Sequence, residues 1–352
     1  MLTTKQKTLR RFWYATVPME HLNGGPKPFR LMDEEIVLFL DEKGAPAALR
    51  DRCCHRTAKL SQGWCDAGQL VCGYHGWTYA ADGTVTRVPQ QDGSRELFKH
   101  QTPAYHCIER YGYAWVALDD PLIPLFDIPE DGASGYRRIH QFYDRWNTAP
   151  LRLMENSFDN AHFSFVHKST FGNMAQPKPV SYDLTETDYG FCATTRVEIL
   201  NPPAAHRVTG TTDPFTVRDM RNHWYLPFCR RMDMTYPSGV RHIIINCATP
   251  ITDGQIQLVQ ILYRNDTEDD CPTQLLIDWD AAIIAEDRAI LESTDPDAAI
   301  DLSRRAEGHM PSDRPGIVMR KRLFELLEAH GEREVYDSPA PAPPRPPQLA
   351  VN

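Results

Sequence analysis

The sequence predicts an α+β protein with an N-terminal all-β domain and a second domain that combines an antiparallel sheet with helices. Two observations predict this class. Short β-like runs broken by turn residues fill roughly the first 120 residues, whereas helix-period and strand-period segments both occur after them. A proline-rich stretch that begins at Asp119-Asp120-Pro121 separates the two patterns. We therefore expect domains over 1–120 and 121–335, followed by a Pro-rich, disordered tail at 336–352.

Composition and charge are those of an ordinary globular protein. The 352 residues are enough for two domains with sizeable cores. The net charge of −9 gives no reason to expect nucleic acid or an anionic membrane as a partner. No apolar run reaches the roughly 18 residues that cross a bilayer, so we expect no transmembrane helix. Nine irregularly spaced cysteines suggest no disulfide framework, and no apolar signal stretch follows Arg10-Arg11, so a cytoplasmic location is expected.

The expected N-terminal strands are short and end at turn signals. Apolar runs at 36–40, 47–50 and 113–118 predict strands, and shorter ones are expected at 71–73 and 77–79. Ala81-Asp82-Gly83-Thr84 predicts a hairpin turn, because Gly83 adopts positive φ without steric cost. These strands suit a β module that carries two loops at one tip.

Two short motifs in this module carry metal-ligand residues. Cys53-Cys54-His55 and, after sixteen intervening residues, Cys72-Gly73-Tyr74-His75 each offer one thiolate and one imidazole. A zinc site can also use two Cys and two His, but in its usual order the two cysteines lie close together in the sequence and so do the two histidines. The observed order suits a two-iron cluster in which Cys53 and Cys72 bind one iron and His55 and His75 the other. Neutral imidazole ligands raise the reduction potential of such a cluster. The motif resembles the Rieske [2Fe–2S] motif.

The second domain shows both periodicities. Apolar residues recur at helical spacing over 151–167, near 272–291 and over 316–330. Between them, partial alternation at 191–200, 223–230, 241–248 and 255–263 predicts strands of an antiparallel sheet with one buried face.

A second group of metal-ligand residues follows the domain boundary. Asp159-x-x-His162-x4-His167 is a weak signal alone, but the cluster motif upstream gives it context. An iron site that activates O₂ commonly uses two His and one carboxylate and leaves other positions open. Asp287 is the best carboxylate candidate, because it shares a helical side with Ile283 and Ile290, which are expected to be buried. The alternative is that Glu286, Asp287 and Arg288 form a solvated turn of charges.

Nearly the whole chain resembles the α subunit of a Rieske non-heme iron oxygenase. The resemblance implies a helix-grip-like catalytic domain, a [2Fe–2S] cluster and a mononuclear Fe(II) that His162, His167 and Asp287 bind. Asn156 matches an asparagine often found near that iron. The wording around the first motif is similar to the methylxanthine N-demethylases and saxitoxin-type hydroxylases of the family. Proline is frequent in the family where Cys54 and Gly73 stand here.

The resemblance also implies partners. In the family, a head-to-tail homotrimer places one subunit's cluster beside the next subunit's iron, and Asp159 would link His162 to His75 of the neighbour. The chain has no Gly-x-Gly-x-x-Gly opening a βαβ unit, so a separate NAD(P)H-dependent reductase, with or without a ferredoxin, is expected to supply electrons.

Three activities follow as alternatives. The first is O₂-dependent hydroxylation or oxidative N- or O-demethylation of a small cyclic molecule. The second is arene cis-dihydroxylation by the same iron. The third is an electron carrier without oxygenase activity, against which His162, His167 and Asp287 stand.

Overall fold

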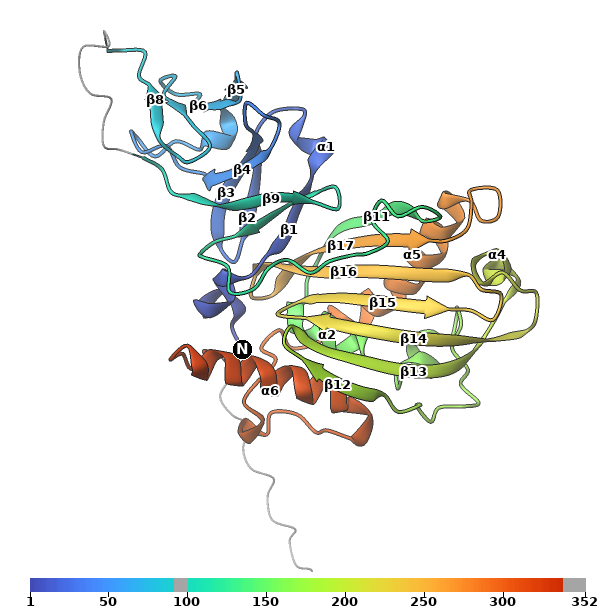
Figure 1. Ribbon diagram of the computed structural model, residues 1–352. Helices are drawn as coiled ribbons and strands as arrows, with labels where there is room; N and C mark the ends of the chain where they lie inside the picture. The colour runs from blue at the N-terminus through green and yellow to red at the C-terminus, as the bar shows by residue number, and fades with distance from the viewer. Residues whose placement is uncertain (92–100, 338–352) are drawn as a thin grey trace, which may run out of the picture.

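The computed structural model describes residues 1–91 and 101–337, and it confirms the predicted α+β class. Figure 1 shows an N-terminal lobe of short strands beside a larger lobe in which one broad sheet is covered by helices. The expected disordered tail falls mainly on residues 338–352, which lie outside the described residues.

The N-terminal lobe contains two antiparallel sheets. Strands follow the order β1-β10-β9-β4-β3-β2 in the larger sheet and β5-β6-β7-β8 in the smaller one. The smaller sheet packs on the larger through a cluster of buried apolar side chains that includes Val37, Leu49, Leu70 and Tyr79. The elements are β1 (Tyr14–Pro18), α1 (Met19–Leu22), β2 (Lys27–Leu31), β3 (Glu34–Leu40), β4 (Pro46–Arg50), β5 (Trp64–Asp66), β6 (Gln69–Val71), β7 (Thr78–Tyr79), β8 (Val85–Arg87), β9 (Ala104–Arg110) and β10 (Tyr113–Ala117).

The C-terminal lobe is built on one long antiparallel sheet with the order β11-β17-β16-β15-β14-β13-β12. Its strands are β11 (Arg137–Trp146), β12 (Asp183–Thr187), β13 (Gly190–Leu200), β14 (Phe215–Tyr225), β15 (Cys229–Thr235), β16 (Arg241–Thr252) and β17 (Gln255–Arg264). The helices are α2 (Pro150–Ser157), α3 (Phe163–Val166), α4 (His206–Thr209), α5 (Thr273–Leu291) and α6 (Arg314–Ala329). In Figure 1, α2 and α5 lie behind the sheet and α6 runs below β12.

Two predicted elements differ from the structure. The expected helix over 151–167 is two helices, α2 and α3, because Asp159 caps the intervening turn by accepting a hydrogen bond from the Ala161 amide at 2.6 Å. The expected strand over 223–230 instead contains the end of β14, a bend at residues 226–228 and the start of β15. Pro227 lies in that bend and has no amide hydrogen for a strand ladder.

An ion-pair network fixes α2 against α6. Arg320 of α6 is 3% exposed and donates to Glu155 of α2 at 2.9 Å and to Glu307 at 2.6 Å. Arg152, also on α2, donates to Glu307 at 2.6 Å. The network holds the helix that carries Asn156.

We expect Glu307→Gln to lower the free energy of unfolding by about 2 kcal/mol at pH 7, because two arginines lose a charged acceptor. Burial alone would raise the pKa of Glu307, but Arg152 and Arg320 lower it to about 2. A depressed pKa contributes stability above the unfolded value of about 4.3 that is lost as pH falls toward 2. Urea unfolding of the native protein and the variant at pH 7 and pH 4 measures the loss in free energy of unfolding at each pH. Glu325→Gln, at an exposed acid on α6, is the control, and equal losses for both variants at pH 7 would contradict the prediction.

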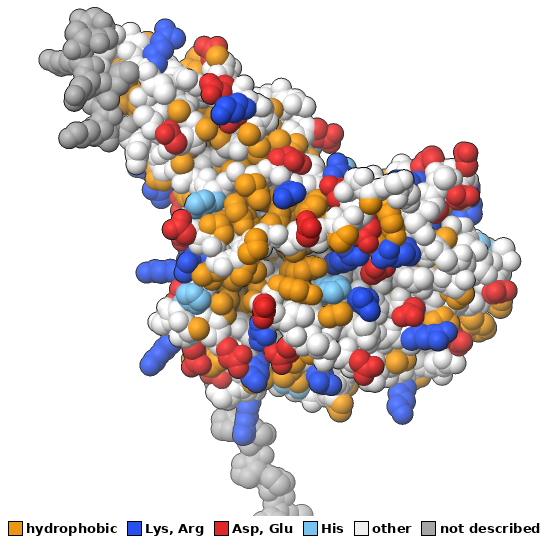
Figure 2. Space-filling view, in the orientation of Figure 1, with side chains coloured by type: hydrophobic (Ala, Val, Ile, Leu, Met, Phe, Trp, Pro, Cys, Tyr) orange, Lys and Arg blue, Asp and Glu red, His pale blue; other side chains and the backbone are white. Residues whose placement is uncertain are grey.

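Apolar side chains gather on the face of the molecule shown in Figure 2, between the two lobes. A groove there is lined by Trp13, Leu125, Phe126, Tyr189 and Tyr225, among others. Within residues 1–91 and 101–337, none of the helices combines the length and apolar character that crossing a bilayer requires.

Candidate active site

The two predicted cluster loops come together at the tip of the N-terminal lobe. Backbone hydrogen bonds close each loop: the Thr57 amide donates to the Cys53 carbonyl at 3.0 Å, and the Gly76 amide donates to the Cys72 carbonyl at 3.0 Å. Gly76 has φ +72°, a backbone conformation that disfavours other residues. The loops therefore present the four predicted ligands from two matching turns.

Cysteines and histidines occupy different environments in these loops. Cys53 and Cys72 are 2% and 1% exposed, whereas His55 is exposed and His75 is half-buried. The two imidazole rings lie 4.7 Å apart, centre to centre, and Trp77 stacks on His55 at 4.5 Å. Burial raises the pKa of the Cys72 thiol, and the neighbouring Cys53 thiol raises it further. A buried sulfur pair and an outward imidazole pair fit a cluster with one sulfur-bound and one histidine-bound iron.

Tyr79 completes the sulfur environment. Its hydroxyl lies 3.0 Å from the Cys53 sulfur and accepts a hydrogen bond from the Cys54 amide at 3.2 Å. Hydrogen bonds to the sulfurs are one of the factors that set the potential of an iron–sulfur cluster. Sequence reasoning did not single out this tyrosine, because it lies on β7, outside both motifs.

The second constellation forms between α2, α3 and α5. One donor atom each of His162, His167 and Asp287 lies within 4.8 Å of the other two. The Nε2 atoms of the two histidines are 3.2 Å apart, and Asp287 Oδ1 lies 3.5 Å from His162 Nε2 and 3.3 Å from His167 Nε2. Two ligands that bind one metal at about 2.1 Å and at right angles are separated by about 3 Å. The spacing fits a mononuclear metal.

The outer nitrogens of both histidines have carboxylate partners. Asp159 Oδ2 lies 3.2 Å from His162 Nδ1, and Glu286 Oε2 lies 3.0 Å from His167 Nδ1. An ionised carboxylate can only accept, so each Nδ1–H group donates a hydrogen bond to its carboxylate and each Nε2 keeps a lone pair for the centre of the site. Burial alone would raise the pKa of Asp159, but the hydrogen bond with His162 and the electrostatic interaction with that imidazole lower it.

The predicted carboxylate is positioned by a neighbouring amide. Asn156 Nδ2 donates to Asp287 Oδ1 at 3.0 Å. Burial alone would raise the pKa of Asp287, yet the contacts with His167 lower it below its usual value. The expected burial of Ile290 is wrong, since that side chain is 50% exposed, whereas Ile283 lines the cavity beside Asp287.

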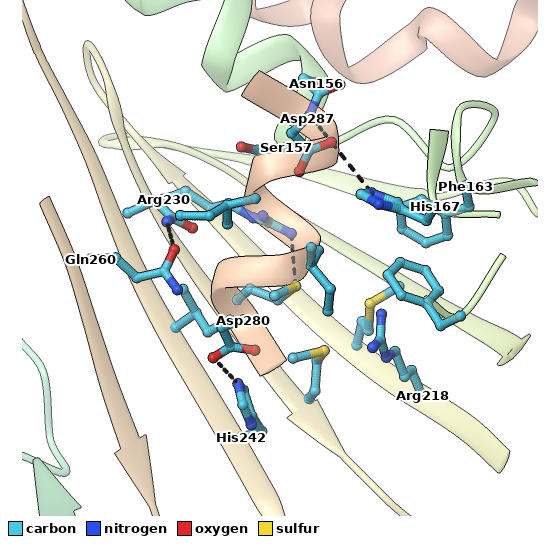
Figure 3. A pocket seen from close by; sticks show the side chains of 18 of the residues that line it. Asn156, Ser157, Phe163, His167, Arg218, Arg230, His242, Gln260, Asp280 and Asp287 are labelled. Carbon is cyan, nitrogen blue, oxygen red and sulfur yellow. Dashed lines mark hydrogen bonds and ion pairs between the residues drawn. The ribbon is translucent and has the colours of Figure 1, made fainter. Parts of the chain in front are cut away.

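The site opens into a cavity between the concave side of the sheet and α5, which Figure 3 shows from close by. Apolar side chains such as Phe163, Ile283 and Leu258 form much of the wall. Polar groups occupy the part away from the triad: His242 Nε2 lies 3.2 Å from Asp280, and Asn246 donates to Gln260 at 2.5 Å. An apolar chamber with a few directed polar groups suits a small organic molecule.

Glu286 and the sheet residues of the cavity were not assigned these positions from the sequence. From the sequence, Glu286 is either part of a charged turn or the ligand to test after Asp287. In the structure it accepts hydrogen bonds from His167 and from the Thr170 hydroxyl, the latter at 2.8 Å. The sequence shows that Glu286 precedes Asp287, but which of the two acids faces the space between the histidines depends on how α5 packs.

The fold and the two metal-ligand groups define a Rieske oxygenase, and comparison with known proteins shows the same. Residues 12–106 match the Rieske [2Fe-2S] domain, and residues 146–329, more than half of the chain, match the vanillate O-demethylase oxygenase C-terminal domain. The chain belongs to this family and is the oxygenase component of a multi-component system. Its cofactors are a Rieske [2Fe–2S] cluster and a mononuclear iron, and both donor sets described above fit them.

Individual relatives cover most of the chain. It is 29% identical to methylxanthine N1-demethylase NdmA of Pseudomonas putida over 94% of this chain and 93% of that protein. The structure of Pseudomonas putida NdmA with caffeine superimposes with a TM-score of 0.79 at 27% identity, covering 94% of each chain. Dicamba monooxygenase bound to dicamba, at 21% identity and a TM-score of 0.78, covers 92% of this chain and 98% of its own and shares the fold.

Proposed function

We propose that this oxygenase removes a methyl group from nitrogen or oxygen of a small cyclic compound by hydroxylating that methyl. The observation that carries the proposal is the open triad of His162, His167 and Asp287 at the floor of a largely apolar cavity. Relatives named as methylxanthine and dehydrodivanillate demethylases support the choice of a methyl group. Bound iron supplies the activation of O₂, with electrons that arrive through the cluster.

The chain's own side chains divide the remaining work. Cys53, His55, Cys72 and His75 hold the cluster, and His162, His167 and Asp287 hold the mononuclear iron. Asp159 and Glu286 keep protons on the outer nitrogens of the histidines and fix the ring orientations, and the amide of Asn156 orients Asp287. The cavity wall excludes bulk water around the substrate.

Electron delivery requires a second subunit and a separate reductase. The chain functions as a cytoplasmic homotrimer in which the exposed tip with His75 packs beside a neighbour's Asp159. Support comes from the position of His55 and His75 at the surface of the lobe and from the partial exposure of Asp159, whose side chain is 31% accessible. The domains of this enzyme are residues 1–120 and 121–335.

The chemical outcome provides the test. We expect one ¹⁸O atom from ¹⁸O₂ in the immediate hydroxylated product, because the second oxygen atom leaves as water with two electrons and two protons. A hydroxymethyl group on N or O then collapses to formaldehyde and the demethylated compound. Purified protein with a surrogate reductase is incubated with N-methyl and O-methyl aromatic compounds. The amounts of formaldehyde formed and of O₂ and NADH consumed are then measured.

Equal amounts of formaldehyde formed and O₂ and NADH consumed support demethylation, and omission of the reductase is the control. A cis-diol with two labelled atoms and no formaldehyde would instead assign the dihydroxylating activity.

A further inference from the structure

Arg218 is a buried cation in the cavity wall, and no acceptor in the described part of the chain pairs with it. It lies on β14, lines the cavity and is 6% exposed. Figure 3 shows its side chain in the cavity wall, below His167 in that view. Within residues 1–91 and 101–337 its guanidinium makes no hydrogen bond or ion pair, and its buried Nε has no acceptor. The guanidinium carbon lies over the Phe171 ring, 4.1 Å from its centre. Guanidinium groups so deeply buried are usually paired with carboxylates.

A second arginine lines the same cavity, and within the described residues it forms no ion pair with a carboxylate. Arg230 of β15 is 9% exposed and donates to the neutral amide oxygen of Asn222 at 2.9 Å and to the Met232 sulfur at 2.8 Å. Burial, together with the nearby Arg218, lowers the pKa of Arg230 to about 10 against the opposing effect of Tyr182 and Asp287, so the group is still charged at neutral pH. The cavity therefore holds two cations near one another, and neither has an acidic hydrogen-bond partner within residues 1–91 and 101–337.

The carboxylates that line the cavity are committed elsewhere. Asp280 accepts from Gln141 at 2.6 Å and lies 3.2 Å from His242, and Asp287 belongs to the metal-ligand group. Neither lies within ion-pair distance of Arg218 or Arg230 in the described part of the chain. Leaving a desolvated charge unpaired costs folding free energy, which a protein tolerates where a ligand supplies the missing charge.

We infer that Arg218, assisted by Arg230, binds an anionic group of the substrate, either a carboxylate or a sulfonate. This inference specifies the substrate class of the proposed demethylation and rests on that proposal. The position is suitable for this role. The Phe171 ring lies between Arg218 and the triad, and it stacks on His167 with 4.6 Å between ring centres. A flat aromatic acid held at Arg218 would extend along the wall with its far end toward His162, His167 and Asp287.

The test uses matched anionic and neutral probes with the iron-loaded full chain under anaerobic conditions. Calorimetric titration compares 4-methoxybenzoate and 4-methoxybenzenesulfonate with 4-methoxybenzamide, which has nearly the same shape and no charge. We expect the better anion to bind at least about 10-fold more tightly than the amide. Arg218→Gln should weaken that anion by about 10- to 100-fold and leave the amide unchanged, the range expected for a charged hydrogen bond. Arg230→Gln should weaken it in the same direction.

Arg221→Gln is the control, because Arg221 lies on the same strand as Arg218 but is exposed. The ligand-free Arg218→Gln protein should melt at or above the temperature of this control, since an unpaired buried charge is removed. Amide binding as tight as anion binding in the native protein would overturn the inference. So would a lower melting temperature with equal loss of all probes, which assigns Arg218 a structural role. Anion preference without formaldehyde release would overturn the proposed demethylation alone.

Discussion

Asp287→Ala should lose the mononuclear iron and all detectable turnover while keeping the visible absorption of the cluster. The native chain should carry about three irons, two in the cluster and one in the mononuclear site. Removal of the carboxylate leaves His162 and His167 as the remaining ligands, and two neutral imidazoles hold Fe(II) more weakly than a set with one anion. Iron analysis, visible spectra and formaldehyde assays measure the three quantities.

Asp278→Ala is the matched control, since Asp278 is an exposed acid on the same helix. It should keep about three irons and normal turnover. Full iron and activity in Asp287→Ala would show that the carboxylate is misassigned, and Glu286 and Glu292 would be tested next. A native chain with only about two irons would indicate an electron carrier instead.

Asp159→Asn should retain both metal centres and yet lose activity by at least about 100-fold. The asparagine oxygen can still accept from the Ala161 amide, so the turn persists. In the native protein His162 Nδ1 lies 3.2 Å from Asp159 Oδ2. The NH₂ group that replaces this oxygen in the variant cannot accept a hydrogen bond from Nδ1–H. The proposed link to His75 of a neighbouring subunit is weakened for the same reason.

A single-turnover experiment separates this effect from loss of metal. After reduction and exposure to O₂ with substrate, the cluster of Asp159→Asn should stay reduced, whereas that of Asp183→Asn, an exposed acid on β12, should reoxidise at the native rate. Normal electron transfer in Asp159→Asn would refute the bridging role.

The sequence alone determined the family and the fold class, and it predicted the residues proposed here as metal ligands. Ligand atoms of a cluster must approach from short loops, so Cys53 and His55, like Cys72 and His75, are close in the chain. His162 and His167 are similarly local, and both lie near α3. Local spacing is visible without a structure because it depends only on backbone geometry.

The sequence favours Asp287 as the acid that meets the histidine pair, but only the tertiary structure shows the different positions of Glu286 and Asp287. Glu286 and Asp287 are neighbours in the sequence, but α5 directs one behind His167 and the other into the centre of the site. The expected apolar side of this helix was partly wrong, since Ile290 is exposed. The phase of a helix against partners about 120 residues away depends on how the whole sheet packs.

The cavity lining likewise depends on the fold. Arg218 and Arg230 gave no sequence signal, because β14 and β15 alternate between a cavity face and an outer face, and the strand limits set that alternation. A run of 223–230 looked like one strand, whereas Pro227 lies in the bend between two. Registers between strands distant in sequence decide which side chains share a pocket, and for this reason the proposed anion-binding residues could be named only from the structure.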